Sequence, residues 1–241
     1  MNKIKVSAVS YTNTLPFLQG IRASDVINDI ELSVDYPSEC ARKVIEDEVD
    51  MGVIPVAALT KLEEYHIIGD YCIGTEDYVD SVFIFSNKPI SEIDTLLLDK
   101  QSRTSNGLAR ILLKHYWKRD VQVLTEGEAD AYVLIGDRTF GKKEEVPYVY
   151  DLGHYWRELT GLPFAFAVWV SNKKLPDAFE EKFNAALAEG VSRPDDVIPG
   201  LPVFPNFDYH KYLNENLNFH LTNEKRQAIE KYLAWYAELE Q

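Results

Sequence analysis

The polar segment at residues 99–105 has the residue types that a protein needs to hold an anion. Ser102, Thr104 and Ser105 stand where an amphipathic helix is expected to begin, and any of them could cap it. The first N–H groups of a helix have no intrahelical acceptor, and the helix dipole favours negative charge there. Arg103 adds a cation with two parallel donors for a carboxylate. A helix cap beside a solvated Arg103 explains the same residues equally well, so both interpretations stay open.

A second polar loop offers neutral hydrogen-bonding groups. Ser10, Tyr11 and Asn13 follow an alternating stretch at residues 3–9 that predicts a strand, and a short apolar segment comes next. This order predicts a strand, a loop and a helix. An ordinary turn in which Asn13 or Thr14 caps the helix is the alternative interpretation.

Two further loops carry candidate residues. The apolar run at residues 129–135 predicts a strand that ends at Gly136 and Asp137. Asp137 could serve as an acid, a base or a ligand for a donor group, or it could bind its own backbone in a turn. Ser81 falls near the beginning of another expected strand, at residues 79–85.

Sequence motifs for nucleotides and metals are absent. The chain has no GxGxxG, no GxxxxGK[ST], no HExxH and no GxSxG, so neither a cofactor nor a metal ion is expected. His154 follows Gly153 near an expected helix start and is the one histidine that we keep as a weak catalytic candidate. Cys40 and Cys72 lack metal-ligand spacing, and we expect two buried thiols.

The composition is that of an acidic globular protein. The 241 residues suit one large or two small domains, and the net charge of −14 argues against nucleic-acid or anionic-membrane partners. The chain has no apolar run of 18 residues and no signal-peptide pattern at its N-terminus, so we expect no membrane partner and a cytoplasmic location.

Strand and helix patterns alternate along the chain, which indicates an α/β fold with mainly parallel sheets. The pattern restarts near residues 85–90, runs to an apolar strand at 162–170, and then ends in helices. We therefore expect two lobes with a ligand cleft between them: lobe I from residues 1–86 with 171–241, and lobe II from residues 87–170. Ligands in open parallel sheets bind beyond the carboxyl ends of strands. Four loops lie at such ends: residues 10–13, 54–55, 101–105 and 136–137.

Several of these stretches together resemble one family. They are SYTNTLPF at 10–17, Asp99 with SRTS at 102–105, AYVLIGD at 131–137, DLG at 151–153 with Trp156, TGLPF at 160–164 and AVW at 167–169. They follow the order seen in the chorismate dehydratases of the futalosine route to menaquinone, and the resemblance spans roughly residues 4–172. Thr12 and Phe17 depart from the family pattern, because Leu is more usual at both positions.

The resemblance implies a periplasmic-binding-protein type 2 fold and a lyase that needs no cofactor. The substrate would be chorismate, which loses water to become 3-[(1-carboxyvinyl)oxy]benzoate. Asn13 and Ser81 would position the enolpyruvyl carboxylate, and that carboxylate would itself take the proton from C3. The other residues expected to bind substrate are Ser10, Tyr11, Arg103, Thr104, Ser105, Gly136 and Asp137.

Other functions fit the same fold. A sister family makes dihydroxynaphthoate later in the same route, but its opening loop lacks the Tyr-x-Asn found here at residues 11–13. A solute-binding protein for a small carboxylate would need export or a lipid anchor, and a ligand-sensing regulatory lobe would need a DNA-binding segment. The sequence leaves the oligomeric state open.

Overall fold

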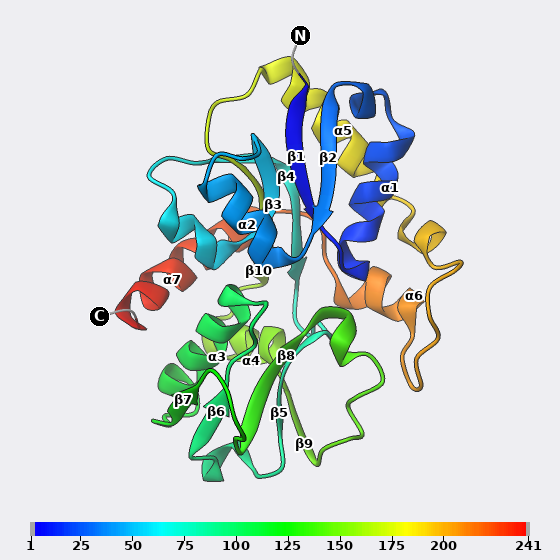
Figure 1. The fold of residues 1–241 in the computed structure, drawn as a ribbon. Coiled ribbons are helices and arrows are strands. Elements are labelled where there is room, and N and C mark those ends of the chain that lie inside the picture. Colours follow the sequence, from blue (N-terminus) through cyan, green and yellow to red (C-terminus); the bar gives the residue numbers. More distant parts are fainter. Residues whose placement is uncertain (1–2, 240–241) are drawn as a thin grey trace.

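Two mixed five-stranded sheets form the frame of the protein, with one above the other in Figure 1. The computed structural model describes residues 3–239. The first sheet has the order β2-β1-β3-β10-β4 and the second the order β7-β6-β8-β5-β9. The strands are β1 (Ile4–Val9), β2 (Ile30–Asp35), β3 (Met51–Pro55), β4 (His66–Thr75), β5 (Val82–Ser86), β6 (Thr95–Leu97), β7 (Gln122–Leu124), β8 (Ala131–Ile135), β9 (Tyr148–Asp151) and β10 (Phe164–Ser171).

Helices pack around both sheets. They are α1 (Leu15–Ala23), α2 (Pro37–Ile45), α3 (Arg103–His115), α4 (Leu152–Thr160), α5 (Asp177–Val191), α6 (Tyr209–Lys211) and α7 (Asn223–Leu239). Short helical turns are η1 (Thr12–Thr14), η2 (Asp25–Asn28), η3 (Val56–Lys61), η4 (Ile90–Glu92), η5 (Gly136–Thr139), η6 (Pro194–Val197) and the π-turn η7 (Tyr212–Asn216). The expected two-lobed α/β fold is confirmed. In the described part of the chain, no helix is both long and apolar enough to serve as a membrane span.

Strand direction differs from the mainly parallel sheets that we expected. β1 is parallel to β2 and β3, and β6 is parallel to β7 and β8. However, β10 is antiparallel to β3 and β4, and β5 is antiparallel to β8 and β9. The chain enters the second sheet through β5 and returns to the first through β10. Neither strand therefore follows a crossover helix within its own sheet, which is the connection that makes neighbouring strands parallel.

Sheet membership also places the lobe boundaries elsewhere than expected. β5 belongs to the second sheet, although residues 1–86 were assigned to lobe I, and β10 belongs to the first sheet, although residues 87–170 were assigned to lobe II. The chain therefore crosses between sheets at residues 76–81 and 161–163. Both strands are apolar and buried on each face, so their sequence does not indicate which sheet they join. Residues 1–2 and 240–241 of the expected lobe I lie outside the described residues.

Helix α7 connects the two halves of the molecule. It packs on β10 of the first sheet and on α3 beside the second. The Tyr232 hydroxyl donates to the carbonyl oxygen of Thr104 at 3.0 Å. A Cβ at Gly107 would lie 2.4 Å from the Tyr232 hydroxyl, so glycine is what lets the two helices approach. The start of α3 is thereby held against the C-terminal helix.

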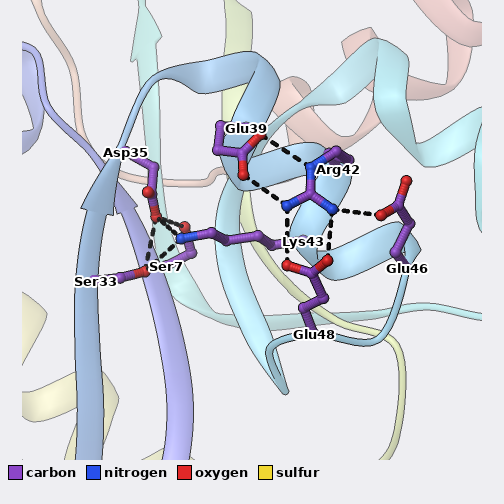
Figure 2. Close-up of polar contacts among 8 residues, drawn as sticks. All are labelled: Ser7, Ser33, Asp35, Glu39, Arg42, Lys43, Glu46 and Glu48. Carbon is purple, nitrogen blue, oxygen red and sulfur yellow. Dashed lines mark hydrogen bonds and ion pairs between the residues drawn. The ribbon is translucent and has the colours of Figure 1, made fainter.

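Charged side chains fix α2 to the edge of the first sheet (Figure 2). Lys43 donates to the Asp35 carboxylate at 2.7 Å, and the Ser7 and Ser33 hydroxyls donate to the same oxygen. Burial opposes ionisation of Asp35, but these donors hold its pKa below the usual value. On the other side of α2, Arg42 pairs with three glutamates. The helix that these pairs hold begins at Pro37 and packs against β1 and β3.

A single carboxylate holds the first crossing segment against α4. Asp151 caps α4 through the backbone N–H groups of Gly153 and His154 and also accepts from those of Val79 and Asp80, at 2.8–3.3 Å. Asp80 has a left-handed backbone with φ of 57°, which costs free energy for a residue with a side chain. Burial raises the pKa of Asp151 to about 6, although the backbone donors lower it.

We predict that ionisation of Asp151 lowers the free energy of unfolding as pH rises. Its folded pKa of about 6 lies above the ordinary value near 4, so the folded state binds the proton more tightly than the unfolded state. This contribution is present at low pH and declines by about 2 kcal/mol between about pH 4 and pH 7.5. Urea unfolding should show that the wild type loses this stability relative to Asp151→Asn. Asp177→Asn, at an exposed carboxylate, is the control and should keep the wild-type slope.

Candidate active site

A cavity of about 60 Å³ lies between the two sheets, and all four of the loops at strand ends contribute to its wall. Its apolar wall consists of Val9, Pro37, Pro55, Ile73, Val79, Val82, Ile135, Phe166 and Ala167. Its polar wall consists of Tyr11, Asn13, Thr14, Ser81, Ser102, Thr104 and Ser105, with the backbone of Gly136.

None of the described side chains that line the cavity carries a formal charge, in a protein whose net charge is −14. Any anion bound here must therefore be stabilised by hydroxyl, amide and backbone N–H groups. Such groups bind an anion well when they are fixed before it arrives and water is excluded.

The start of α3 supplies one set of donors. The Ser102 hydroxyl accepts from the backbone N–H of Ser105 at 3.1 Å, so Ser102 is the helix cap among the three residues that could have served. The next backbone N–H groups, of Arg103 and Thr104, have no acceptor within the helix. This end of a 13-residue helix also carries the positive end of the helix dipole. A carboxylate in the cavity would be stabilised by both.

Asn13 and Ser81 line the cavity from different lobes. The Asn13 carbonyl oxygen accepts from the Thr14 hydroxyl at 3.1 Å. The Ser81 hydroxyl accepts from the hydroxyl of Tyr212 at 3.0 Å. Asn13 follows β1 of the first sheet and Ser81 precedes β5 of the second, so a ligand between them contacts both lobes.

The rim of the cavity is a polar cluster around Tyr11. Its hydroxyl donates to the side-chain oxygen of Gln101, and the positive charge of Arg138 lies close to it. Burial raises the pKa of Tyr11, and the neighbouring Arg138 opposes that rise. Arg138 pairs with the buried Asp99 carboxylate at 2.7 Å. Gly136 has φ of 63°, and a Cβ there would lie 2.8 Å from the Tyr11 ring, so only glycine fits.

Asp137 joins the two lobes beside the cavity. Its carboxylate accepts from the backbone N–H of Thr12 at 3.0 Å and from the Thr12 hydroxyl at 2.9 Å. Thr12 belongs to η1 after the first sheet's β1, while Asp137 belongs to η5 after the second sheet's β8. Burial raises the pKa of Asp137, although the donors of Thr12 lower it. Asp137 therefore holds the lobes together at this point.

The structure brings most of the expected site residues together. Six of them line the cavity: Tyr11, Asn13, Ser81, Thr104, Ser105 and Gly136. Ser10 and Arg103 have exposed side chains and Asp137 faces Thr12, so none of these three lines it. His154 also lies outside the cavity, where it stacks on Tyr78 and pairs with Asp77.

Sequence reasoning did not assign four residues to the site. Ser102 and Thr14 were recognised only as possible helix caps, yet both line the cavity. Arg138 reaches the rim although Arg103 was the expected cation. Tyr212 comes from the last third of the chain, where no motif marks it. Among residues 3–239, no group of three or more His, Cys, Asp or Glu side chains is placed to hold a metal ion, so no metal ligand can be named.

The two sheets, with the cavity between them, form a two-lobed fold of the periplasmic-binding-protein type. Protein AF1704 of Archaeoglobus fulgidus has a similar structure, with a TM-score of 0.75 at 16% identity over 99% of this chain and 97% of that one. A Candida albicans protein described as having the generic periplasmic binding protein fold has a TM-score of 0.65 at 12% identity and covers 100% of this chain and 92% of its own.

The chain belongs to the menaquinone biosynthesis family, whose sequence profile matches residues 4–238. A chorismate dehydratase of Thermus thermophilus is 26% identical over 226 residues, covering 81% of this chain and 83% of the relative. A chorismate dehydratase of Campylobacter jejuni is 26% identical over 182 residues, covering 73% and 71%.

We predict that Asp137→Ala loosens the contact between the lobes. The substitution leaves the buried N–H and hydroxyl of Thr12 without an acceptor, which costs about 1–3 kcal/mol. Urea unfolding should show this loss, and amide exchange at Thr12 should accelerate. Asp120→Ala removes an exposed carboxylate and should change stability by less than about 0.5 kcal/mol. Unchanged exchange at Thr12 would show that Asp137 does not hold the lobes together.

Proposed function

We propose that this protein is a chorismate dehydratase, a carbon–oxygen lyase that removes water from chorismate to give 3-[(1-carboxyvinyl)oxy]benzoate in menaquinone biosynthesis. The observation that carries the proposal is the meeting of Asn13, Ser81 and the start of α3 around one uncharged cavity. Membership of the menaquinone biosynthesis family and the names of two relatives support it.

The cavity suits a ring that carries two carboxylates. The free backbone N–H groups at the start of α3 bind the ring carboxylate. Asn13 and Ser81 bind the enolpyruvyl carboxylate from the opposite side. The apolar side chains, among them Phe166 and Val79, contact the ring and exclude water. Because hydroxyl and amide donors are already fixed by protein partners, little reorganisation accompanies binding.

The substrate supplies its own base. The enolpyruvyl carboxylate takes the proton from C3, and the electron pair of that C–H bond forms a ring double bond as the C4–O bond breaks. The departing hydroxide takes the proton back from the carboxylic acid and leaves as water, so the carboxylate is regenerated. The ring becomes aromatic, and no net oxidation or reduction occurs. Charge that develops on the ring carboxylate during proton loss is stabilised by the α3 N-terminus.

Orientation is the main contribution that the protein makes in this mechanism. A base held at near-attack distance raises a rate by many orders of magnitude over a free one, and a displacement of about 1 Å can cost about 100-fold. Asn13 and Ser81 therefore act by fixing where the carboxylate lies relative to C3.

The first test is turnover of chorismate by purified protein without added cofactor or metal. Loss of the diene absorbance, with a product lighter by one water in mass spectrometry, would establish the reaction. Binding of chorismate without turnover would contradict the proposal and favour a solute-binding function, which the shared fold permits. Neither binding nor turnover would also contradict it, and the sister dihydroxynaphthoate reaction would be examined next.

We predict that Asn13→Ala lowers kcat by at least about 100-fold, because the carboxylate loses one of its two positioning groups. The protein should still fold, since Asn13 is not part of the apolar core, although the buried Thr14 hydroxyl loses its acceptor. Asn87→Ala, at an exposed side chain after β5, is the matched control and should keep wild-type turnover. Full activity in Asn13→Ala would show that this amide does not position the substrate.

A further inference from the structure

Two hydrogen-bonded pairs of side chains lie at the wall of the cavity. The Thr14 hydroxyl donates to the Asn13 oxygen at 3.1 Å. The Tyr212 hydroxyl donates to the Ser81 oxygen at 3.0 Å. Thr14, Asn13 and Ser81 line the cavity, whereas Tyr212 lies behind them.

A hydroxyl has one proton to donate, and this limits what each member of the Tyr212–Ser81 pair can do. The tyrosine has one hydroxyl proton and gives it to Ser81. Ser81 therefore has to donate its own proton elsewhere. Within residues 3–239 its hydroxyl has no other hydrogen-bond partner, and it faces the cavity.

Tyr212 is held rigidly enough to impose this direction. Its relative exposure is 0%, and its ring packs against Phe140 and Phe207 with centroids 5.2 and 5.4 Å away. It begins the π-turn η7, an irregular turn that directly follows the short helix α6. Such turns recur at functional sites. Burial raises the pKa of Tyr212 above its ordinary value, so the hydroxyl keeps its proton at every working pH.

We propose that Tyr212 is a positioning residue that keeps the Ser81 hydroxyl as a hydrogen-bond donor to a carboxylate in the cavity. The identity of this carboxylate as the enolpyruvyl group of chorismate rests on the proposed function. The direction of the hydrogen bond between Tyr212 and Ser81 is independent of that function.

Removal of the Tyr212 hydroxyl leaves Ser81 free to rotate and to donate to a neighbouring protein oxygen. The bound carboxylate then loses a fixed donor, and its distance from C3 is less well controlled. This affects the chemical step more than binding, because the ring carboxylate is still held by the start of α3.

The test is a double-mutant cycle between Tyr212→Phe and Ser81→Ala. We expect Tyr212→Phe to lower kcat by about 10–100-fold while KM changes by less than about threefold. Because Tyr212 acts only through Ser81, the double variant should be no slower than Ser81→Ala alone. The rate loss in Tyr212→Phe should be the same at about pH 6 and pH 9. Wild-type kcat in Tyr212→Phe, or a loss in the double variant equal to the product of the single losses, would overturn the proposal.

A control variant separates this role from a structural one. Tyr209→Phe removes a hydroxyl of the same aromatic cluster, one that donates to the carbonyl oxygen of Pro202 away from the cavity, and it should keep wild-type kcat. If Tyr212→Phe does not fold, Ser81→Ala alone tests the donor. It should lower kcat by at least about 10-fold, and wild-type kcat in it would overturn the proposal.

Binding of 3-(carboxymethoxy)benzoate, a stable dicarboxylate related to the product, distinguishes this inference from the proposed function. If the wild type does not dehydrate chorismate, the proposed function fails, and the same cycle is measured by calorimetry with this probe. Non-additive losses of affinity in Tyr212→Phe and Ser81→Ala would still support the inference. Additive losses, or no binding by the wild type, would overturn it.

Discussion

A buried hydrogen-bond donor without an acceptor costs free energy, and this requirement shapes the region between the two sheets. The cavity side chains named above are tied to protein partners on their outer side, which leaves a defined set of groups facing inward. Ser102 accepts from the backbone of Ser105, and Ser81 accepts from Tyr212. The wall is therefore polar in a fixed pattern although it contains no charged side chain. An acidic protein can bind an anionic ligand in this way without a lysine or arginine inside the site.

Topology brings these groups together. The loops after β1, β3 and β8 and the start of α3 come from two different sheets, and they meet only because the chain crosses between the sheets twice. Asp151 fixes the first crossing against α4. Contacts from α7 hold the start of α3, since Tyr232 donates to the carbonyl of Thr104. The cavity is thus a product of the whole chain and not of one motif.

Local structure could be predicted from the sequence where a short segment determines its own conformation. The helix over residues 152–160 begins at the Asp151 cap, beside the helix start that we expected near His154, and it ends at Gly161 with φ of 72°. A helix beginning close to residue 103 was also predicted from its polar cap residues and apolar face. The Asn13 and Ser81 loops were identified from a family resemblance, and both line one cavity.

Long-range placement was not predictable from the same patterns. Arg103 and Arg138 each follow a polar turn, and only tertiary packing decides that Arg138 reaches Tyr11 while Arg103 faces solvent. The runs at β5 and β10 are apolar on both faces, so neither shows which sheet it joins. Tyr212 lies 131 positions from Ser81 along the chain, and no spacing rule links residues so far apart.

The position of Ser81 has a mechanical consequence. This residue ends one of the two segments that connect the sheets, whereas Gly136 and Thr104 belong to loops of the second sheet's own strands and helices. If one lobe rotates on the other, the connecting segments act as the pivot, and a group on the pivot travels through the shortest arc. Ser81 would keep its place beside Tyr212 during opening and closing, while the rest of the wall swings toward or away from it. The donor that we propose for Ser81 would then stand where rigid-body motion displaces it least.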